Sequence, residues 1–68
     1  MNNKIIATRP ITNNLSINII DIDYGINDKV TSIIGGKKHT NIIHFNGKGL
    51  PYITIYRQRY YLNEFIKL

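Results

Sequence analysis

The feature that most constrains the fold is a ten-residue run, residues 15–24 (LSINIIDIDY), in which apolar and polar residues alternate around two adjacent isoleucines. Alternation with a period of two is the pattern of a β-strand with one buried face. The apolar residues up to Ile19 fall on one face of such a strand, whereas those from Ile20 onward fall on the opposite face. A β-bulge or a strong bend at Ile19–Ile20 reconciles the two halves.

Further short runs typical of strands follow, with turn residues between them. Residues 29–34 (KVTSII) are rich in β-branched side chains, and residues 39–45 (HTNIIHF) resume the alternation with Ile43 and Phe45 on one face. The segments GIND and GG separate these runs with residues that favour turns. The pattern indicates antiparallel hairpins.

The sequence predicts its clearest turn at Asn46–Gly47, because both residues tolerate the positive φ that tight hairpin turns require. In the strand that follows, side chains alternate between the two faces. Ile53 and Ile55 share one face, which we expect to face the core. Tyr52 and Tyr56 then lie on the outer face.

Near the C-terminus, Leu62, Phe65 and Ile66 recur at helical spacing, with Asn63 as a candidate cap. So short a helical segment forms only where it packs against the rest of the chain. The whole sequence therefore predicts a mainly β fold. We expect a small curled antiparallel sheet, or an SH3- or OB-like barrel, of about five short strands with a short C-terminal helical turn.

The chain has 68 residues, enough for one small β domain, which we place at residues 15–68 after a flexible N-terminal arm at residues 1–14. A domain of this size buries only about 60% of its unfolded surface. The sequence has no cysteine for a disulfide, and with two histidines a zinc site would need unusual ligands. We expect a homodimer, in which a second copy adds buried surface.

No apolar run approaches the ~20 residues that a membrane helix needs. Residues 1–14 also lack the apolar stretch of a signal peptide. We therefore expect a soluble, cytoplasmic protein without a membrane partner. The excess of Ile, Asn, Lys and Tyr, whose codons are rich in A and T, suggests a bacterium with an A/T-rich genome or one of its phages.

The charges are distributed unevenly along the chain. The formal net charge is +5, and residues 29–63 contain six lysines and arginines but no acidic residue. A basic surface of this kind attracts phosphate backbones or acidic protein faces, and salt weakens that attraction.

Tyrosines accompany these cations, and a tyrosine beside an arginine can stack on nucleic-acid bases or anchor a protein interface. The predicted binding surface combines a Tyr/Arg cluster with lysines from two hairpin tips. Its residues are Tyr52, Tyr56, Arg57, Arg59, Tyr60, Lys37, Lys38 and Lys48. Of the adjacent pair Tyr60–Tyr61, one ring must face outward or cover a sheet edge. The alternative, that these rings chiefly support the sheet as cross-strand partners, stays open.

Other motifs give weaker signals. Residues 35–40 (GGKKHT) lack the spacing of a phosphate-binding loop. Asp21 and Asp23 project from one face of a strand and could share a divalent cation, although exposed strand acids are the ordinary interpretation. His39 and His44 lie five positions apart, an odd spacing that places them on opposite faces of one strand. We expect no cofactor, no metal site and no enzymatic activity.

Three functional hypotheses follow, in order of preference. The first is a small basic protein that binds DNA or RNA through a Tyr/Arg-bearing sheet face. The alternative is an inhibitor, encoded by a phage or mobile element, that binds a host nucleic-acid-processing protein such as a defence-system nuclease. The third is a minimal metal-dependent nuclease.

Overall fold

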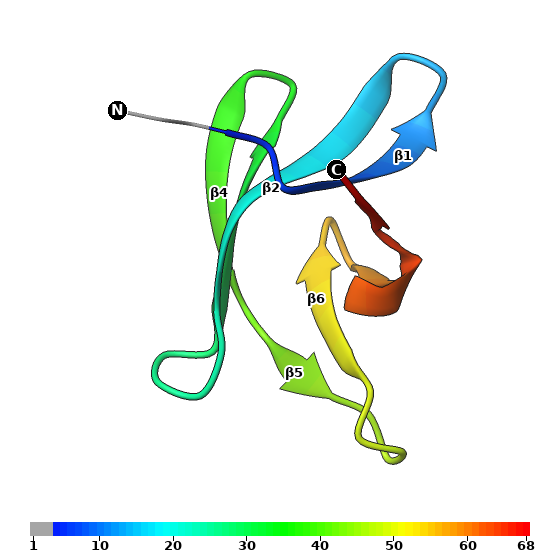
Figure 1. The fold of residues 1–68 in the computed structure, drawn as a ribbon. Coiled ribbons are helices and arrows are strands. Elements are labelled where there is room, and N and C mark those ends of the chain that lie inside the picture. Colours follow the sequence, from blue (N-terminus) through cyan, green and yellow to red (C-terminus); the bar gives the residue numbers. More distant parts are fainter. Residues whose placement is uncertain (1–3) are drawn as a thin grey trace.

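The computed structural model describes residues 4–68, which form two antiparallel β-sheets and one 3-10 turn (Figure 1). The elements in chain order are β1 (Ala7–Thr12), β2 (Leu15–Asp23), β3 (Lys29–Ile34), β4 (Lys37–Ile42), β5 (His44–Phe45), β6 (Pro51–Ile55), β7 (Gln58–Tyr61), η1 (Leu62–Glu64) and β8 (Ile66–Lys67). One sheet has the order β4-β3-β2-β1-β8, and the other has the order β5-β6-β7. The predicted mainly β fold with a curled antiparallel sheet is confirmed, and the described strands form two sheets rather than one closed barrel.

The double isoleucine in β2 forms the irregularity that its sequence predicts. Ile19 pairs with Ser32, but the next paired residue of β2 is Asp21, opposite Thr31, so Ile20 is an extra residue in the ladder. A bulge of this kind shifts the alternation by one residue. Ile19 is therefore buried, and Ile22 packs against the same core although an odd number of positions separates the two.

The core is a single cluster that draws side chains from both sheets and from the C-terminal segment. Its buried members are Ala7, Ile17, Ile19, Val30, Ile34, Ile43, Ile53, Ile55, Tyr60 and Phe65. Ile53 and Ile55 face inward from β6, as the alternation of that strand predicts. Their burial turns the intervening side chains of β6 toward the outer surface.

The chain passes from one sheet to the other at Ile43, between β4 and β5. The amide of Ile43 donates a 2.7 Å hydrogen bond to the carbonyl oxygen of Asp28, and the Ile43 side chain is buried. Phe45, in contrast, is 53% exposed. The prediction that Ile43 and Phe45 share one face is wrong, because the change of sheet interrupts the alternation between them.

The five-stranded sheet begins before residue 14, the predicted end of the N-terminal arm. Residues 7–12 form β1, which pairs with β2 on one side and with β8 on the other. The amide of Leu68 donates a 3.0 Å hydrogen bond to the carbonyl oxygen of Ile6, so the C-terminus is held beside the start of β1. Residues 1–3 of the predicted arm lie outside the described residues.

The predicted C-terminal helical turn is present as η1. Its cap differs from the prediction, because Asn63 lies inside the turn and Tyr61 precedes it. Glu64 stabilises the start of the turn by accepting a 3.1 Å hydrogen bond from the Tyr61 amide. No helix formed by residues 4–68 is long and apolar enough to cross a bilayer.

The turn predicted at Asn46–Gly47 is a longer loop between β5 and β6. The residue with positive φ there is Gly49, at +81°. The Asn46 side-chain oxygen accepts hydrogen bonds from the amides of Lys48 (2.8 Å) and Leu50 (2.9 Å). Asn46 therefore stabilises the loop through its side chain, and the expected positive φ at Asn46–Gly47 is wrong.

Candidate nucleic-acid interface

A row of aromatic side chains crosses the outer face of the β5-β6-β7 sheet. Strand register places Tyr52 of β6 between His44 of β5 and Tyr61 of β7. The His44 and Tyr52 rings are stacked with their centroids 5.7 Å apart, and the Tyr52 and Tyr61 rings are tilted with centroids 5.3 Å apart. We call His44, Tyr52 and Tyr61 the aromatic row. Cross-strand aromatic pairs of this kind stabilise a sheet. His44 is exposed, whereas Tyr52 and Tyr61 are partly buried.

Arg59 adds a positive charge to the aromatic row. It lies opposite Thr54 in the β6–β7 ladder, and its guanidinium carbon is 4.4 Å from the centroid of the Tyr52 ring. The arginine side chain is exposed. Among residues 4–68 the one ion pair joins Arg9 to Glu64, and Arg59 therefore faces solvent without a carboxylate partner.

Neighbouring hydrogen-bond donors lower the pKa of the Tyr61 hydroxyl. The Asn46 side-chain amide donates a 3.4 Å hydrogen bond to this oxygen. That hydrogen bond, together with the neighbouring Arg59, lowers the pKa of Tyr61 below its ordinary value. These donors favour the ionised form of the Tyr61 hydroxyl.

Tyr56 and Arg57 form the turn between β6 and β7. Both have positive φ, at +52° and +66°, and both are exposed. Tyr56 is 72% exposed and touches the edge of the His39 ring, with ring centroids 6.2 Å apart and planes at 77°. The structure therefore presents both predicted site residues at a hairpin tip, beyond the aromatic row.

Tyr60 does not belong to this surface, contrary to the prediction. It lies opposite Ile53 in the β6–β7 ladder, and its side chain is buried in the core. The Arg9 guanidinium carbon lies 5.0 Å from the centroid of its ring. Of the adjacent tyrosines, Tyr61 is the outward one. Recognising Tyr56–Arg57 as a two-residue turn would have assigned the two rings correctly, because the turn sets the alternation of β7.

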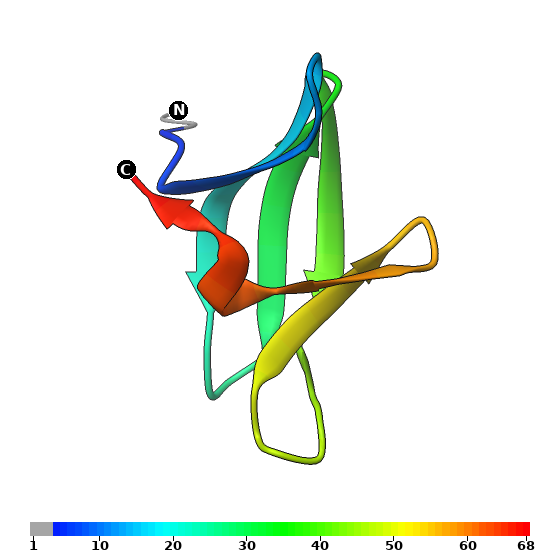
Figure 2. The same cartoon turned by 90° about the vertical axis from the view of Figure 1, so that its right-hand side faces the viewer.

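The predicted lysines are exposed but do not surround the aromatic row. Lys37 and Lys38 follow the β3–β4 turn, whereas Lys48 lies in the β5–β6 loop. These two turns lie at opposite ends of the molecule, with the β6–β7 turn between them (Figures 1 and 2). Such positions suit long-range electrostatic attraction better than shared contact with one small ligand.

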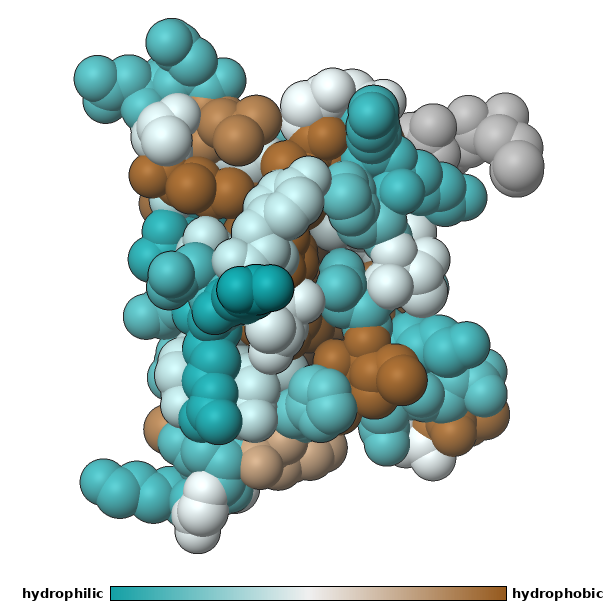
Figure 3. Space-filling view, turned by 180° about the vertical axis from the view of Figure 1, so that it is seen from behind, coloured by the Kyte–Doolittle hydropathy of each residue, from teal (hydrophilic) through white to brown (hydrophobic). Residues whose placement is uncertain are grey.

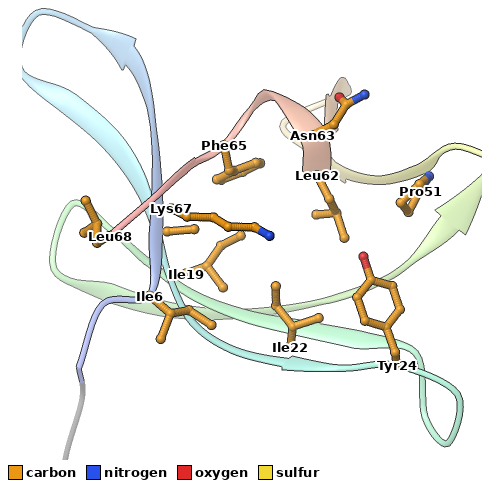
Figure 4. A pocket seen from close by; sticks show the side chains of 11 residues that line it. Ile6, Ile19, Ile22, Tyr24, Pro51, Leu62, Asn63, Phe65, Lys67 and Leu68 are labelled. Atoms are coloured by element: carbon orange, nitrogen blue, oxygen red, sulfur yellow. The ribbon is translucent and has the colours of Figure 1, made fainter.

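Seen from behind, the surface is mostly hydrophilic, and its apolar patches are separate from one another (Figure 3). An apolar groove of about 510 Å³ is lined by side chains of β2, η1 and the C-terminal segment, including Ile22, Leu62 and Phe65 (Figure 4). Tyr24 and Lys67 place their polar ends in it. No member of the aromatic row lines this groove, so the two features are distinct surfaces.

Of the two acidic residues singled out in the sequence, Asp21 is exposed within β2, whereas Asp23 joins Asp28 in stabilising the turn between β2 and β3. Asp28 accepts a 2.7 Å hydrogen bond from the Gly25 amide, and Asp23 accepts a 3.1 Å hydrogen bond from the Asn27 side chain. His39 and His44 lie on different strands, β4 and β5, rather than on one. Within residues 4–68 no three His, Cys, Asp or Glu side chains are grouped closely enough to hold a metal ion.

No protein-family model, curated protein or solved structure matches the chain.

Proposed function

We propose that this protein binds single-stranded DNA or RNA through the outer face of the β5-β6-β7 sheet. The observation that carries the proposal is the aromatic row with the Arg59 guanidinium over the Tyr52 ring. Aromatic side chains stack on unpaired bases, and each stacked base contributes about 1–3 kcal/mol. Bases within a duplex are already stacked on one another, so a row of rings on a sheet favours a single strand.

Charge supports the same assignment. The net charge of +5 attracts a polyanion, although Glu64 lies beside the aromatic row, where it accepts the 3.1 Å hydrogen bond of the Tyr61 amide. Glu64 is paired with Arg9, while Asp23 and Asp28 hold the β2–β3 turn. A phosphate that approaches Arg59 therefore meets cationic and aromatic side chains, and Arg9 offsets the charge of the neighbouring Glu64.

The test is fluorescence anisotropy with labelled oligo-dT and oligo-U strands, measured between about 50 and 200 mM salt. Arg59→Ala should weaken binding and reduce the slope of log K against log salt by about 0.7 if its charge contacts one phosphate of a single strand. Lys29→Ala is the matched control, because it removes one exposed cation from the five-stranded sheet. Wild-type protein that shows no saturable binding, or Arg59→Ala protein that binds like wild type, contradicts the proposal.

The second candidate function is that of an inhibitor, encoded by a phage or mobile element, that binds a host nucleic-acid-processing protein. The exposed Tyr56–Arg57 tip supports it, because tyrosine and arginine are frequent anchors in protein interfaces. A pull-down from bacterial lysate, with and without nuclease treatment, separates the two functions. Nucleic acid that is lost on treatment supports the first, and a stoichiometric protein that persists supports the second.

A further inference from the structure

The β6–β7 turn has a backbone conformation that is energetically unfavourable for its two residues, Tyr56 and Arg57. Ile55 pairs with Gln58, so Tyr56 and Arg57 form a two-residue turn with positive φ at both positions. Hairpin turns of this type favour Asn-Gly or Gly-Gly, because a side chain in the left-handed region clashes with the backbone. Of residues 4–68, the only other non-glycine residue with positive φ is Asp28, a type that tolerates it.

The β3–β4 hairpin of the same chain shows the less costly solution. Ile34 pairs with Lys37, and the two residues between them are Gly35 and Gly36, with φ of +57° and +80°. The chain thus builds one two-residue turn with glycines and the other with an aromatic and a cationic residue. Strained residues of this kind concentrate at functional sites, where the side chains they present offset the cost.

Neighbouring contacts hold this tip in place without covering it. The Asn41 side chain donates a 3.1 Å hydrogen bond to the Thr54 carbonyl oxygen, which ties β6 to β4 just before the turn. His39 touches one edge of the Tyr56 ring, yet 72% of this residue is exposed. The turn projects from the body of the molecule (Figure 2). The tip is therefore pre-oriented and open to a ligand.

We propose that the Tyr56–Arg57 tip is a second contact for the same single strand, with Tyr56 stacking on one base and Arg57 binding an adjacent phosphate. This inference rests on the proposed function. Tyr56 lies four residues beyond Tyr52, or about 13 Å along an extended strand. Arg59 lies between them on the neighbouring strand. A single strand that follows the hairpin meets the aromatic row, then the Arg59 charge, and then the tip.

The test replaces the tip by the residues that its backbone favours, in a Tyr56→Asn, Arg57→Gly double variant. Relief of strain should raise the melting temperature by about 5 °C, while loss of one stacked base and one phosphate contact should weaken binding of oligo-dT at least about fivefold. Gly35→Asn is the control, because Asn tolerates the φ of +57° and its Cβ meets the Leu15 side chain at an ordinary 3.6 Å. It should leave oligo-dT binding unchanged. Tyr56→Phe should also keep it.

Each outcome distinguishes the tip from the sheet face. A double variant that is more stable and binds weakly supports the inference. A more stable double variant that binds oligo-dT like wild type overturns the role of the tip and leaves the proposed function standing. A double variant that is no more stable overturns the argument from strain. Wild-type protein that binds a protein partner but neither oligo-dT nor oligo-U overturns both proposals.

Discussion

Replacing Ile53 by valine removes one methyl group from a side chain that has no solvent exposure. The position bears on the proposed function because the burial of Ile53 turns Tyr52 and Thr54 of β6 toward the outer surface. An Ile→Val change in a core costs about 0.5–1.5 kcal/mol. A domain of 68 residues has a total stability of roughly 3–10 kcal/mol, so the variant stays folded. Its melting temperature should fall by about 2–12 °C.

Ile42→Val is the matched control for this prediction. It removes the same atoms from β4, where the isoleucine is 56% exposed, and should change the free energy of unfolding by less than about 0.5 kcal/mol. Urea unfolding followed by circular dichroism measures both variants. If the two substitutions cost the same, or if Ile42→Val costs more, β6 does not bury Ile53, and the aromatic row is not a surface feature.

Three further predictions concern single side chains. In a site-specific NMR titration, the pKa of Tyr61 should lie below the ordinary value of 10.0, because hydrogen bonding from Asn46 and the neighbouring Arg59 favour its phenolate, and the pKa of Tyr24 should lie above that value, because partial burial disfavours its phenolate. Arg59→Ala should raise the pKa of Tyr61. A pKa of Tyr61 above that of Tyr24 would contradict the described contacts. Asn46→Ala should destabilise the fold by about 1–3 kcal/mol in urea unfolding, since two loop amides lose their acceptor; an unchanged midpoint would show that water replaces it. Glu64→Gln should cost less than about 1 kcal/mol in the same assay, because its 3.8 Å ion pair with Arg9 is partly exposed and the amide oxygen still accepts the Tyr61 hydrogen bond; a larger loss would mean that the charge itself matters.

The strand faces were predictable wherever alternation runs without interruption. Ile53 and Ile55 point inward as expected, and the clash of two alternating patterns at Ile19–Ile20 predicts the bulge that the structure contains. Both inferences depend on local periodicity, because a strand that buries one face must place its apolar residues on that face.

The errors arise where a turn or a change of sheet resets the alternation. Tyr60 was assigned to the surface because the sequence offers no glycine to mark Tyr56–Arg57 as a turn. β1 was placed in an arm although Asn13 and Asn14 join it to β2 as a hairpin, and only its pairing with β8 joins segments that are distant in sequence. Local patterns carry no information about such pairing.

The sequence pattern identified site residues on the β6–β7 hairpin but did not predict the aromatic row that crosses the sheet. Tyr52, Tyr56, Arg57 and Arg59 occupy its outer face and tip. His44 was missed as a partner of Tyr52, because it follows the change of sheet at Ile43. The pairing of His44 with Tyr52 becomes predictable only once the order of the strands in the sheet is known.

An NMR titration of the ¹⁵N-labelled protein with oligo-dT identifies the residues that contact a single strand. Shift changes should concentrate on the outer face of the β5-β6-β7 sheet, at His44, Tyr52, Arg59 and Tyr61. Residues of the apolar groove, such as Ile22, should remain unaffected by the strand. Shift changes confined to the groove or to the five-stranded sheet, or their absence at low salt, would contradict the claim that this protein binds single strands through its aromatic row.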